Sequence, residues 1–497
     1  MTSSTSSPKH TGKNSYNFKN VSAYDLFYQL TYMSAMAAAG ISRSKTFEIA
    51  AQAKSPVAQY FEAVNTLVVE LRYSYPDACR TIGEQAKSEE VRSFLLRFSD
   101  ALRSGEPLNA FLTREADVQS KNYENEYERE LESLKKWSDA FSSIIISVAL
   151  IVIVNLVSTM IYSMGTGMMV GLVGTAVVMG FFGTWVVSRA APQEKMAISS
   201  ADGSADQRRA LRQIKIMGPV AVAVASVMVL LGVHRGLIMA AIGALLFPVG
   251  FIGYMADKKI NQKDAEVSSF LRSLGSMASS TGSTLKEALT KIDLSSFPTL
   301  QPDIELLLIR LQALVSPQIC WQRFGQETGS RLTSAAVEIF YESVKVGADP
   351  EKVGFYCSRF ASRTAQLRAK RRGVAASFSW LTLVMHATVG VLMVFVLEII
   401  VNFMHMMEEA VSQEALDMAT QNIAVPLASF SASDLQFLQA MTTLMVVLLA
   451  VISATAIIAS DGGYKFKFVF YLSLLMVISG AGFWFVPPVV AKILTVS

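Results

Sequence analysis

Long apolar stretches alternate with two long polar stretches along this chain. Residues 140–188 contain 49 positions without one charged side chain. A transmembrane helix needs about 20 apolar residues, so this stretch predicts two spans rather than one. Because the first apolar run begins only after residue 140, no signal peptide is expected. The whole chain predicts seven spans, at residues 141–163, 169–188, 216–233, 236–256, 373–404, 435–460 and 468–491.

The two polar stretches have the pattern of helical bundles. Residues 21–140 and 257–372 lack the Asn-Gly and Asp-Gly signals of hairpins and show few alternating segments, so each predicts a helical domain. Residues 1–20, rich in Ser, Thr and Lys, predict a disordered tail. Residues 405–434 predict an external acidic loop without Lys or Arg. The expected fold class is an all-α polytopic membrane protein, with two repeated helical-bundle domains and about seven transmembrane helices.

The distribution of Lys and Arg predicts the sidedness of these spans. If the N-terminus is cytoplasmic, Arg235 and Lys492 are the only two of the 44 Lys and Arg residues on the outer side. The basic residues nearest the membrane agree, because Arg189 and those in 208–215 lie on the same side as 258–259. We therefore expect a multi-pass protein of the cytoplasmic membrane, with both helical domains in the cytoplasm and the C-terminus outside.

The two polar domains repeat one another at an offset of 242 residues. Glycines keep this offset without a gap, and a glycine can close a helix in the left-handed conformation. Trp137 maps to residue 379, beside Trp380, so the repeat extends to the membrane. Each repeat then comprises a helical domain, a long helix into the membrane and three spans, and span 236–256 links the two. The glycines are Gly40, Gly83 and Gly105 in the first repeat and Gly282, Gly325 and Gly347 in the second.

The helices that enter the membrane carry opposite charges in the two repeats. Residues 124–139 are mainly acidic, whereas residues 359–372 contain six basic residues and no acid. Two interpretations are open: the helices pack against each other across a pseudo-twofold axis, or each faces water and a different partner. Basic residues at this level also anchor proteins to anionic lipid headgroups, and tryptophans to the interface. The expected juxtamembrane anchors are Trp137, Trp380, Arg368, Lys370, Arg371 and Arg372.

Composition and motifs argue against catalysis. The chain is 52% hydrophobic and 17% charged, below the roughly 25% of charged residues in soluble domains. Cys79, Cys320 and Cys357 form no CxxC pair, and the chain has neither a P-loop nor an HExxH helix. A membrane protease would need two intramembrane aspartates, which the spans lack. We therefore expect no enzyme, no metal, no cofactor and no nucleic-acid partner. A transporter or channel, the main alternative, would depend on the intramembrane residues His386 and Glu398.

Two pairs of segments carry a family resemblance. Leu30–Ser42 has an echo in Phe270–Thr284, and Leu102–Leu108 has one in Val344–Pro350. They resemble a helix start and a second glycine turn of the type II secretion system F family, the inner-membrane platforms of type IV pilus-like machines. Tandem domains with about seven spans are most similar to the archaeal members of that family, and among these to the archaellum platforms.

This resemblance implies a role without catalysis. A cytoplasmic hexameric ATPase would dock on the helical domains, and the platform, a homodimer, would add pilin-like or archaellin-like subunits to a filament that an archaellum also rotates. An archaeal adhesive or aggregation pilus is the alternative machine. Residues 257–372 have 17 basic and 12 acidic residues and residues 1–140 have 17 and 18, so domain 2 is expected to be the main electrostatic dock. The candidate ATPase contacts are Arg43, Lys45, Lys345, Lys352, Arg359 and Arg363.

Overall fold

The computed structural model describes residues 18–161, 166–194, 196–198, 203–418 and 432–495. In this part of the chain nearly every element is a helix, no β-strand occurs, and one isolated β-bridge joins Ala197 to Ser330. The first half contains α1 (Ala23–Ala37), α2 (Arg43–Gln52), α3 (Ala58–Val69), α4 (Tyr75–Glu84), α5 (Glu89–Ser104), α6 (Leu108–Ile161), α7 (Thr166–Ala190) and α8 (Ala205–Leu230). The second contains α9 (Arg235–Thr281), α10 (Leu285–Lys291), a 3-10 turn (Leu294–Ser296), α11 (Gln301–Gln312), α12 (Pro317–Glu327), α13 (Arg331–Lys345), α14 (Pro350–Met418), α15 (Ala432–Asp461) and α16 (Lys467–Thr495).

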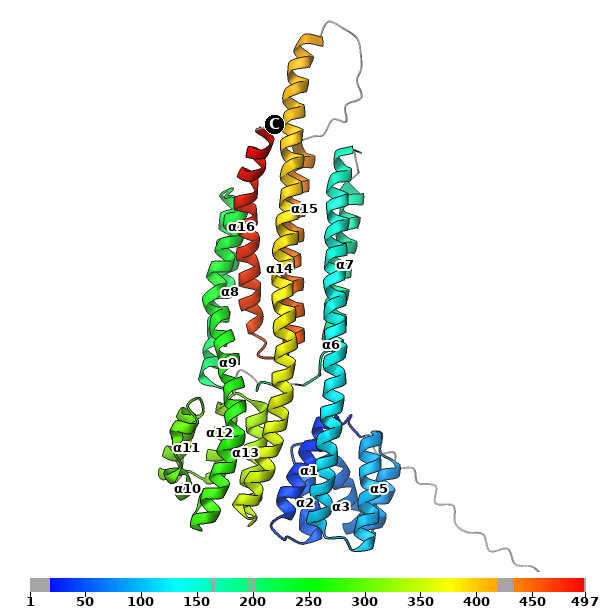
Figure 1. Ribbon diagram of the computed structural model, residues 1–497, viewed down its shortest axis with the longest axis vertical. Helices are drawn as coiled ribbons and strands as arrows, with labels where there is room; N and C mark the ends of the chain where they lie inside the picture. The colour runs from blue at the N-terminus through cyan, green and yellow to red at the C-terminus, as the bar shows by residue number, and fades with distance from the viewer. Residues whose placement is uncertain (1–17, 162–165, 195, 199–202, 419–431, 496–497) are drawn as a thin grey trace, which may run out of the picture.

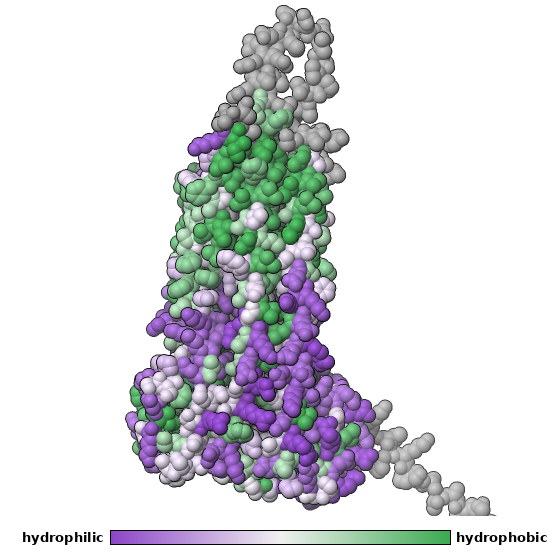
Figure 2. All heavy atoms as spheres, in the orientation of Figure 1, coloured by the Kyte–Doolittle hydropathy of each residue, from purple (hydrophilic) through white to green (hydrophobic). Residues whose placement is uncertain are grey.

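The molecule is elongated, with a polar end and an apolar end. Figure 2 shows hydrophilic residues gathered over the bundles at the bottom and hydrophobic residues over the long helices above them. Within the described residues, seven helices are long and apolar enough to cross a membrane: α6, α7, α8, α9, α14, α15 and α16. The chain is therefore a multi-pass membrane protein with an all-α fold, as the sequence predicts.

The duplication is visible helix by helix. Helices α1–α5 form bundle 1 together with the polar part of α6, and α10–α13 form bundle 2 with the polar parts of α9 and α14 (Figure 1). Four of the repeated glycines are left-handed, with φ between +57° and +94°, at the turns that flank each bundle. Arg72 and Leu314, also 242 positions apart, share the same rare left-handed backbone, with φ of 59° and 58°. Two bundles of one design therefore stand side by side.

One glycine pair has a different role from the expected helix end. Gly83 and Gly325 lie inside α4 and α12, where they have ordinary helical backbone. A Cβ atom at Gly83 would lie 3.1 Å from the Cβ of Leu95 on α5, and one at Gly325 would lie 3.1 Å from the Cα of Ser334 on α13. These glycines therefore allow two neighbouring helices to approach closely, rather than closing a helix.

Three helices continue from the polar end into the membrane without a break. The predicted boundaries at 140–141, 256–257 and 372–373 fall inside α6, α9 and α14, so no helix end marks them. Likewise α14 continues through Met418, where the sequence predicts a loop from residue 405. Residues 419–431 of that loop, the predicted tail before residue 18 and residues 164–165, between the first two predicted spans, lie outside the described residues. The change from charged to apolar residues thus predicts where the membrane surface lies, but it does not predict where a helix ends.

The transmembrane helices form two unequal groups. In Figure 1, α8, α9 and α16 lie on one side, α6 and α7 lie on the other, and α14 and α15 lie between them. Helices α9 and α16 meet along a glycine seam, where a Cβ at Gly243 would lie 2.7 Å from the carbonyl oxygen of Ser473 and one at Gly236 would lie 2.8 Å from that of Gly480. Small residues of this kind let membrane helices pack backbone to backbone.

Candidate functional site: the junction between the bundles and the membrane

The acidic helix α6 and the basic helix α14 pack against each other as parallel neighbours. Two of the three ion pairs between them join residues 242 positions apart, which are equivalent positions of the two repeats. Equivalent positions meet in this way only on a twofold axis, so α6 and α14 lie on the pseudo-twofold axis of the duplication. The first interpretation of their opposite charges is therefore confirmed. The pairs are Arg359–Asp117 at 2.8 Å, Arg363–Glu124 at 3.2 Å and Lys370–Glu128.

Arg368 lies inside the junction, where it is only 1% exposed. Its guanidinium group donates to Asp264 Oδ2 of α9 at 2.7 Å and to Glu194 Oε1, in the linker between α7 and α8, at 3.0 Å. Asp264 also accepts hydrogen bonds from the hydroxyls of Ser330 and Thr333 at the start of α13. A single buried arginine thus joins α14, α9, α13 and the linker, and each charge in the group has a partner.

Arg371, one turn further along α14, is bound by backbone rather than by acids. It is 2% exposed and donates to the carbonyl oxygens of Pro192 at 2.8 Å, Ser460 at 2.9 Å and Ala459 at 3.3 Å. Carbonyls at the C-terminal end of a helix lack partners within the helix, so the end of α15 is a natural acceptor for a cation. Arg368 and Arg371 therefore cannot reach lipid headgroups, and the prediction that they act as lipid anchors is wrong.

A second buried cluster holds the turn between α15 and α16. Lys467 Nζ lies 3.1 Å from Asp257 Oδ2 and 2.9 Å from Asp461 Oδ2, and all three side chains are less than a tenth exposed. The Tyr464 backbone donates to Asp257 Oδ1 at 2.8 Å, and its hydroxyl donates to the carbonyl of Gln207 at the start of α8. The cluster therefore fixes the polar ends of α8, α9, α15 and α16 to one another.

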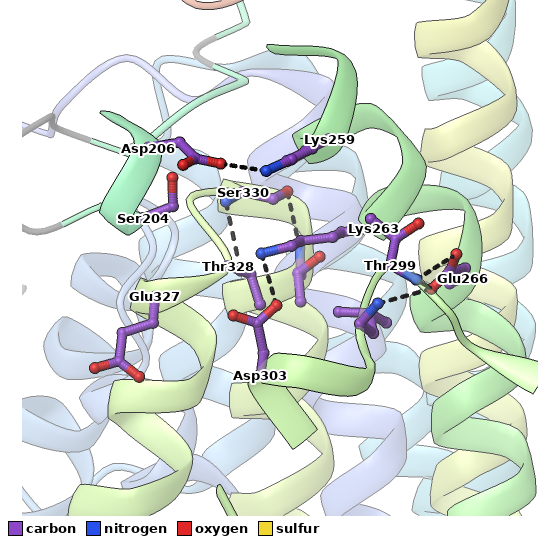
Figure 3. Close-up of polar contacts among 12 residues, drawn as sticks. Ser204, Asp206, Lys259, Lys263, Glu266, Thr299, Asp303, Glu327, Thr328 and Ser330 are labelled. Atoms are coloured by element: carbon purple, nitrogen blue, oxygen red, sulfur yellow. Dashed lines mark hydrogen bonds and ion pairs between the residues drawn. The ribbon is translucent and has the colours of Figure 1, made fainter. Parts of the chain in front are cut away.

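Helix α9 collects further contacts along its polar half, as Figure 3 shows. Lys259 Nζ pairs with Asp206 of α8 at 2.7 Å, and Lys263 Nζ pairs with Asp303 of α11 at 2.6 Å. One turn away, the Glu266 carboxylate accepts from the backbone N–H groups of residues 299 and 300, at the start of α11. A carboxylate at a helix N-terminus is favoured by the helix dipole. Bundle 2 is thus fixed to the membrane helix from which it extends.

The linker between α7 and α8 crosses to bundle 2. Its Ile198 N–H donates to the carbonyl of Gly329 at 2.9 Å, and the Arg331 N–H donates to the carbonyl of Met196 at 3.1 Å. With the Glu194–Arg368 pair, these bonds attach a segment of the first repeat to the second. Hydrogen bonds and buried charges therefore link both repeats at the junction between the bundles and the membrane helices.

Comparison with known proteins gives a family match for the first repeat. Residues 30–156, which run from α1 to the apolar part of α6, match the family model of the type II secretion system (T2SS), protein F. The chain carries a protein F domain. The Flagella accessory protein J of Methanocaldococcus jannaschii is 24% identical over 309 residues, which cover 60% of this chain and 55% of that protein. The protein of the same name from Methanococcus voltae is 23% identical over 330 residues, with coverage of 63% and 58%.

The chain thus spans somewhat more than half the length of these curated relatives. No solved structure matches. The match to the protein F family ends before the second repeat, but the second repeat has the same helices, the same left-handed turns and the same glycines at the offset of 242. Bundle 2 therefore repeats the design of the region that matches the protein F family.

The membrane-distal turns of the two bundles present exposed basic side chains. Arg43 and Lys45 lie exposed at the start of α2, where Lys45 pairs with Glu48 at 2.9 Å, and Lys352 lies exposed in the first turn of α14. Lys345 ends α13 and has a repeat equivalent that sequence reasoning missed: Arg103, which ends α5. The offset of 242 would have identified it. Four of the six predicted contacts thus lie at one end, whereas Arg359 and Arg363 lie between the bundles.

The other predicted residues occupy varied positions. Trp137 and Trp380 are 46% and 70% exposed, as an anchor in the interface would be, and Arg372 donates to Asn261 Oδ1 at 2.7 Å. His386 is buried, with its Nε2 2.9 Å from the Ser479 hydroxyl of α16, so it joins two helices. Glu398 is half-buried in the apolar part of α14, six residues before the predicted end of its span at residue 404. Among the described residues, no group of three His, Cys, Asp or Glu side chains is placed to hold a metal ion.

Proposed function

We propose that this protein is the membrane platform of a type IV pilus-like filament machine, with the archaellum as the first choice. Support comes from the protein F domain at residues 30–156 and from the likeness to two proteins named Flagella accessory protein J. In this role the chain catalyses nothing itself. A cytoplasmic ATPase supplies the work, and the platform passes it to filament subunits in the membrane.

The observation that carries the proposal is the rigid connection between the two bundles and the membrane helices. Helices α6, α9 and α14 cross from one region to the other without a break, and Arg368 and Arg371 hold the crossing point from inside. A displacement of the bundles must therefore reach the membrane helices, because no flexible linker separates them. A transporter needs no such connection, whereas a platform driven from the cytoplasm depends on it.

The proposal includes a sidedness for the chain. We propose that residues 21–140 and 257–372 lie in the cytoplasm and that the C-terminus lies outside, because nearly all Lys and Arg residues then face the cytoplasm. We also propose that the platform works as a homodimer. The acidic residues after position 405 would then face the exterior, beside the emerging filament.

The ATPase is proposed to dock on the membrane-distal turns of the two bundles. These turns carry the exposed residues Arg43, Lys45, Lys345 and Lys352, and their repeated design offers two similar surfaces to one partner. Arg359 and Arg363 are less suited to this contact, since they lie between the bundles, where they pair with Asp117 and Glu124 of α6. Charge pairs at such a surface act mainly on encounter and register.

The test is co-purification of the detergent-solubilised protein with the secretion-type ATPases of its host, at low and high salt. Reversal of three charges, Arg43→Glu, Lys45→Glu and Lys352→Glu, is expected to reduce capture at low salt by about tenfold, which corresponds to about 1.4 kcal/mol. The matched control is Lys121→Glu, an exposed lysine about 20 Å further along α6.

Capture that is equal for the triple variant and the control would contradict this docking surface. Failure to capture any ATPase, by protein whose melting transition shows it to be folded, would contradict the platform role itself. The identity of the captured ATPase distinguishes an archaellum from an adhesive or aggregation pilus, because each machine has its own motor.

A further inference from the structure

The duplication predicts where each membrane helix should pack. If the repeats were complete copies, α8 would pack on α6 and α7 as α16 packs on α14 and α15. Helix α16 does pack there: Ser479 lies 2.9 Å from His386 of α14, and a Cβ at Gly482 would lie 3.7 Å from Val391. Helix α8 instead lies beside α9, on the far side of the molecule from α6 and α7 (Figure 1). The position equivalent to that of α16 is therefore left without a helix of this chain in the described structure.

The two connecting segments explain why α8 lies elsewhere. The segment between α15 and α16 is residues 462–466, which is too short for anything but a tight turn. The segment between α7 and α8 is residues 191–204, and it crosses beneath Arg371 to bond with Gly329 and Arg331 of bundle 2. This longer linker carries α8 away from its own repeat. The difference is thus built into the chain by the same linker that ties the two repeats together.

Equivalent side chains of α14 and α6 differ in exposure, as expected if α6 lacks a neighbour that α14 has. Met385 and His386 face the helices around α14 and are 8% and 1% exposed. Their equivalents in α6 are Ser143, which is exposed, and Ile144, which is half-buried. One turn further, the buried Val389 is equivalent to an exposed serine at 147. The same face that is covered in the second repeat is therefore open in the first.

Helices α15 and α7 show the same contrast. We compared them by aligning their polar ends, Asp461 with Ala190. The buried residues Val446, Leu449 and Ser453 of α15 then correspond to Thr175, Val178 and Phe182 of α7, and Val178 and Phe182 are 68% and 57% exposed. Helix α7 packs on α6 and α15, and α15 packs on the equivalent helices α14 and α7. The additional neighbour of α15 is α16, so α16 accounts for the difference in burial. We call the open face on α6 and α7, defined by Ser143, Ser147, Thr175, Val178 and Phe182, the vacant seat.

The vacant seat has the dimensions and direction of one transmembrane helix. Its occupied equivalent holds α16 alone, which runs parallel to α14 from the polar end of the molecule. Small residues line the seat, and glycines 167, 171 and 174 of α7 meet nothing within 4 Å of an added Cβ. The glycines in the apolar half of α9, by contrast, lie against α16 or the residue that precedes it: these are Gly236, Gly243, Gly250 and Gly253. The glycines of α9 thus show small residues beside a close helix partner, whereas glycines 167, 171 and 174 of α7 have none in the described structure.

We propose that the vacant seat binds the transmembrane helix of one filament subunit, with its N-terminus at the polar end. This inference rests on the proposed platform function and names the place where a subunit is held. The occupied equivalent is enclosed by α9, whereas the seat is open to the bilayer, so a helix can enter it sideways from the lipid. A seat with this access suits a component that is taken up and passed on.

The test uses site-specific photo-crosslinking in native membranes that contain the filament subunit. Val178 is replaced by the photoreactive amino acid p-benzoylphenylalanine, and Val222 on α8 serves as the matched control, because both are exposed valines in the membrane, at 68% and 67%. We expect about tenfold more crosslinking to the subunit from position 178, the ratio that about 1.4 kcal/mol of preferential binding produces. Equal crosslinking from both positions, crosslinking to a second copy of this chain, or none from position 178 would overturn the proposal.

A second variant separates this proposal from the platform function. Thr175→Trp fills the seat with a large side chain, and Val222→Trp is its control. We expect Thr175→Trp to abolish filament assembly while ATPase capture and the melting transition stay at the level of the control. Normal filaments with Thr175→Trp would overturn the seat and leave the platform intact, whereas loss of ATPase capture by the unmodified protein would overturn the platform itself.

Discussion

The two repeats share one set of helices but differ in charge along α6 and α14. At the twofold axis of a true homodimer, each side chain meets its own copy, so like charges oppose each other. Here the two copies lie in one chain, which has an acid at positions 117 and 128 and a base at the equivalent 359 and 370. Duplication therefore allows opposite charges to meet at equivalent positions, which two identical chains cannot achieve, and it favours pairing within the chain over pairing between chains.

The repeats also differ in how they meet the membrane. The second repeat is a closed group of helices, with α16 enclosed by α9, α14 and α15, while the first is a pair of helices with one open face. The open face depends on the linker after α7, which joins the second repeat through Arg368 and Arg371. The comparison indicates that the second repeat gives rigidity and the first gives access.

Removal of Arg368 is expected to have the largest effect. Arg368→Met leaves the carboxylates of Asp264 and Glu194 buried without their cation, which costs about 3–5 kcal/mol in other proteins. We expect a large drop in the melting temperature of the solubilised protein. The control is Lys370→Met, whose ion pair with Glu128 is half exposed and should contribute less than about 1 kcal/mol. Equal melting temperatures for the two variants would contradict the central role given to Arg368.

A substitution in the glycine seam should rank second. A Cβ at Gly250 would overlap the backbone of Phe470 in α16, so Gly250→Val must push α9 and α16 apart, at a cost of about 1–3 kcal/mol. Gly174→Val is the control, because nothing lies within 4 Å of a Cβ there. Thermal melting in detergent measures both. If Gly174→Val is as unstable as Gly250→Val, another group must lie against this face of α7, and the face is not open.

The opposite charges of Arg359 and Asp117, which meet on the pseudo-twofold axis, can be exchanged by substitution. Arg359→Glu places two acids against each other with Asp117, and adding Asp117→Arg restores an opposite pair. Because both residues are about two-fifths exposed, we expect a coupling free energy of only about 0.2–1 kcal/mol. A double-mutant cycle on the melting transition measures it. A double variant no more stable than the single Arg359→Glu variant would show that this pair does not join the repeats.

The smallest expected effect is on the pH dependence of bundle 2. Burial raises the pKa of Asp303 above its ordinary value of 3.8, although Lys263 opposes that shift. A carboxyl with a raised pKa is easier to protonate in the folded state than in the unfolded state. Its contribution to stability therefore increases as the pH falls through the folded-state pKa towards 3.8. The wild type should gain stability relative to Asp303→Asn over that range, measured by melting at several pH values; a difference that does not change with pH would contradict this.

Much of the fold follows from sequence pattern. The apolar runs predict seven spans, the glycine offset predicts the duplication, and the opposite charges of residues 124–139 and 359–372 allow two interpretations, one of which is that α6 and α14 meet. In each case, the physical cause acts locally or between repeat equivalents, so a single sequence contains the signal. Arg103 could also have been predicted as a candidate ATPase contact, because it lies 242 positions before Lys345.

The junction could not be predicted in the same way. Basic residues next to a span usually face water or headgroups, and nothing local to Arg368 or Arg371 indicates that the α7–α8 linker would cover them. Asp264 and Glu194 are 70 positions apart in the sequence and become partners only through Arg368. The charges of Asp461 and Lys467 do flank a short turn between two spans, which was a usable signal for the second cluster.

The unbroken length of α14 turns the junction into a fulcrum. Arg371 lies 21 residues from the start of that helix, so about 30 Å of rod extends into bundle 2 and about 70 Å extends in the opposite direction, at 1.5 Å per residue. A sideways push of about 3 Å at the membrane-distal turn then swings the far end by about 7 Å the other way, in proportion to the two arm lengths. A machine built on this helix gains distance at the cost of force, by a factor of about two.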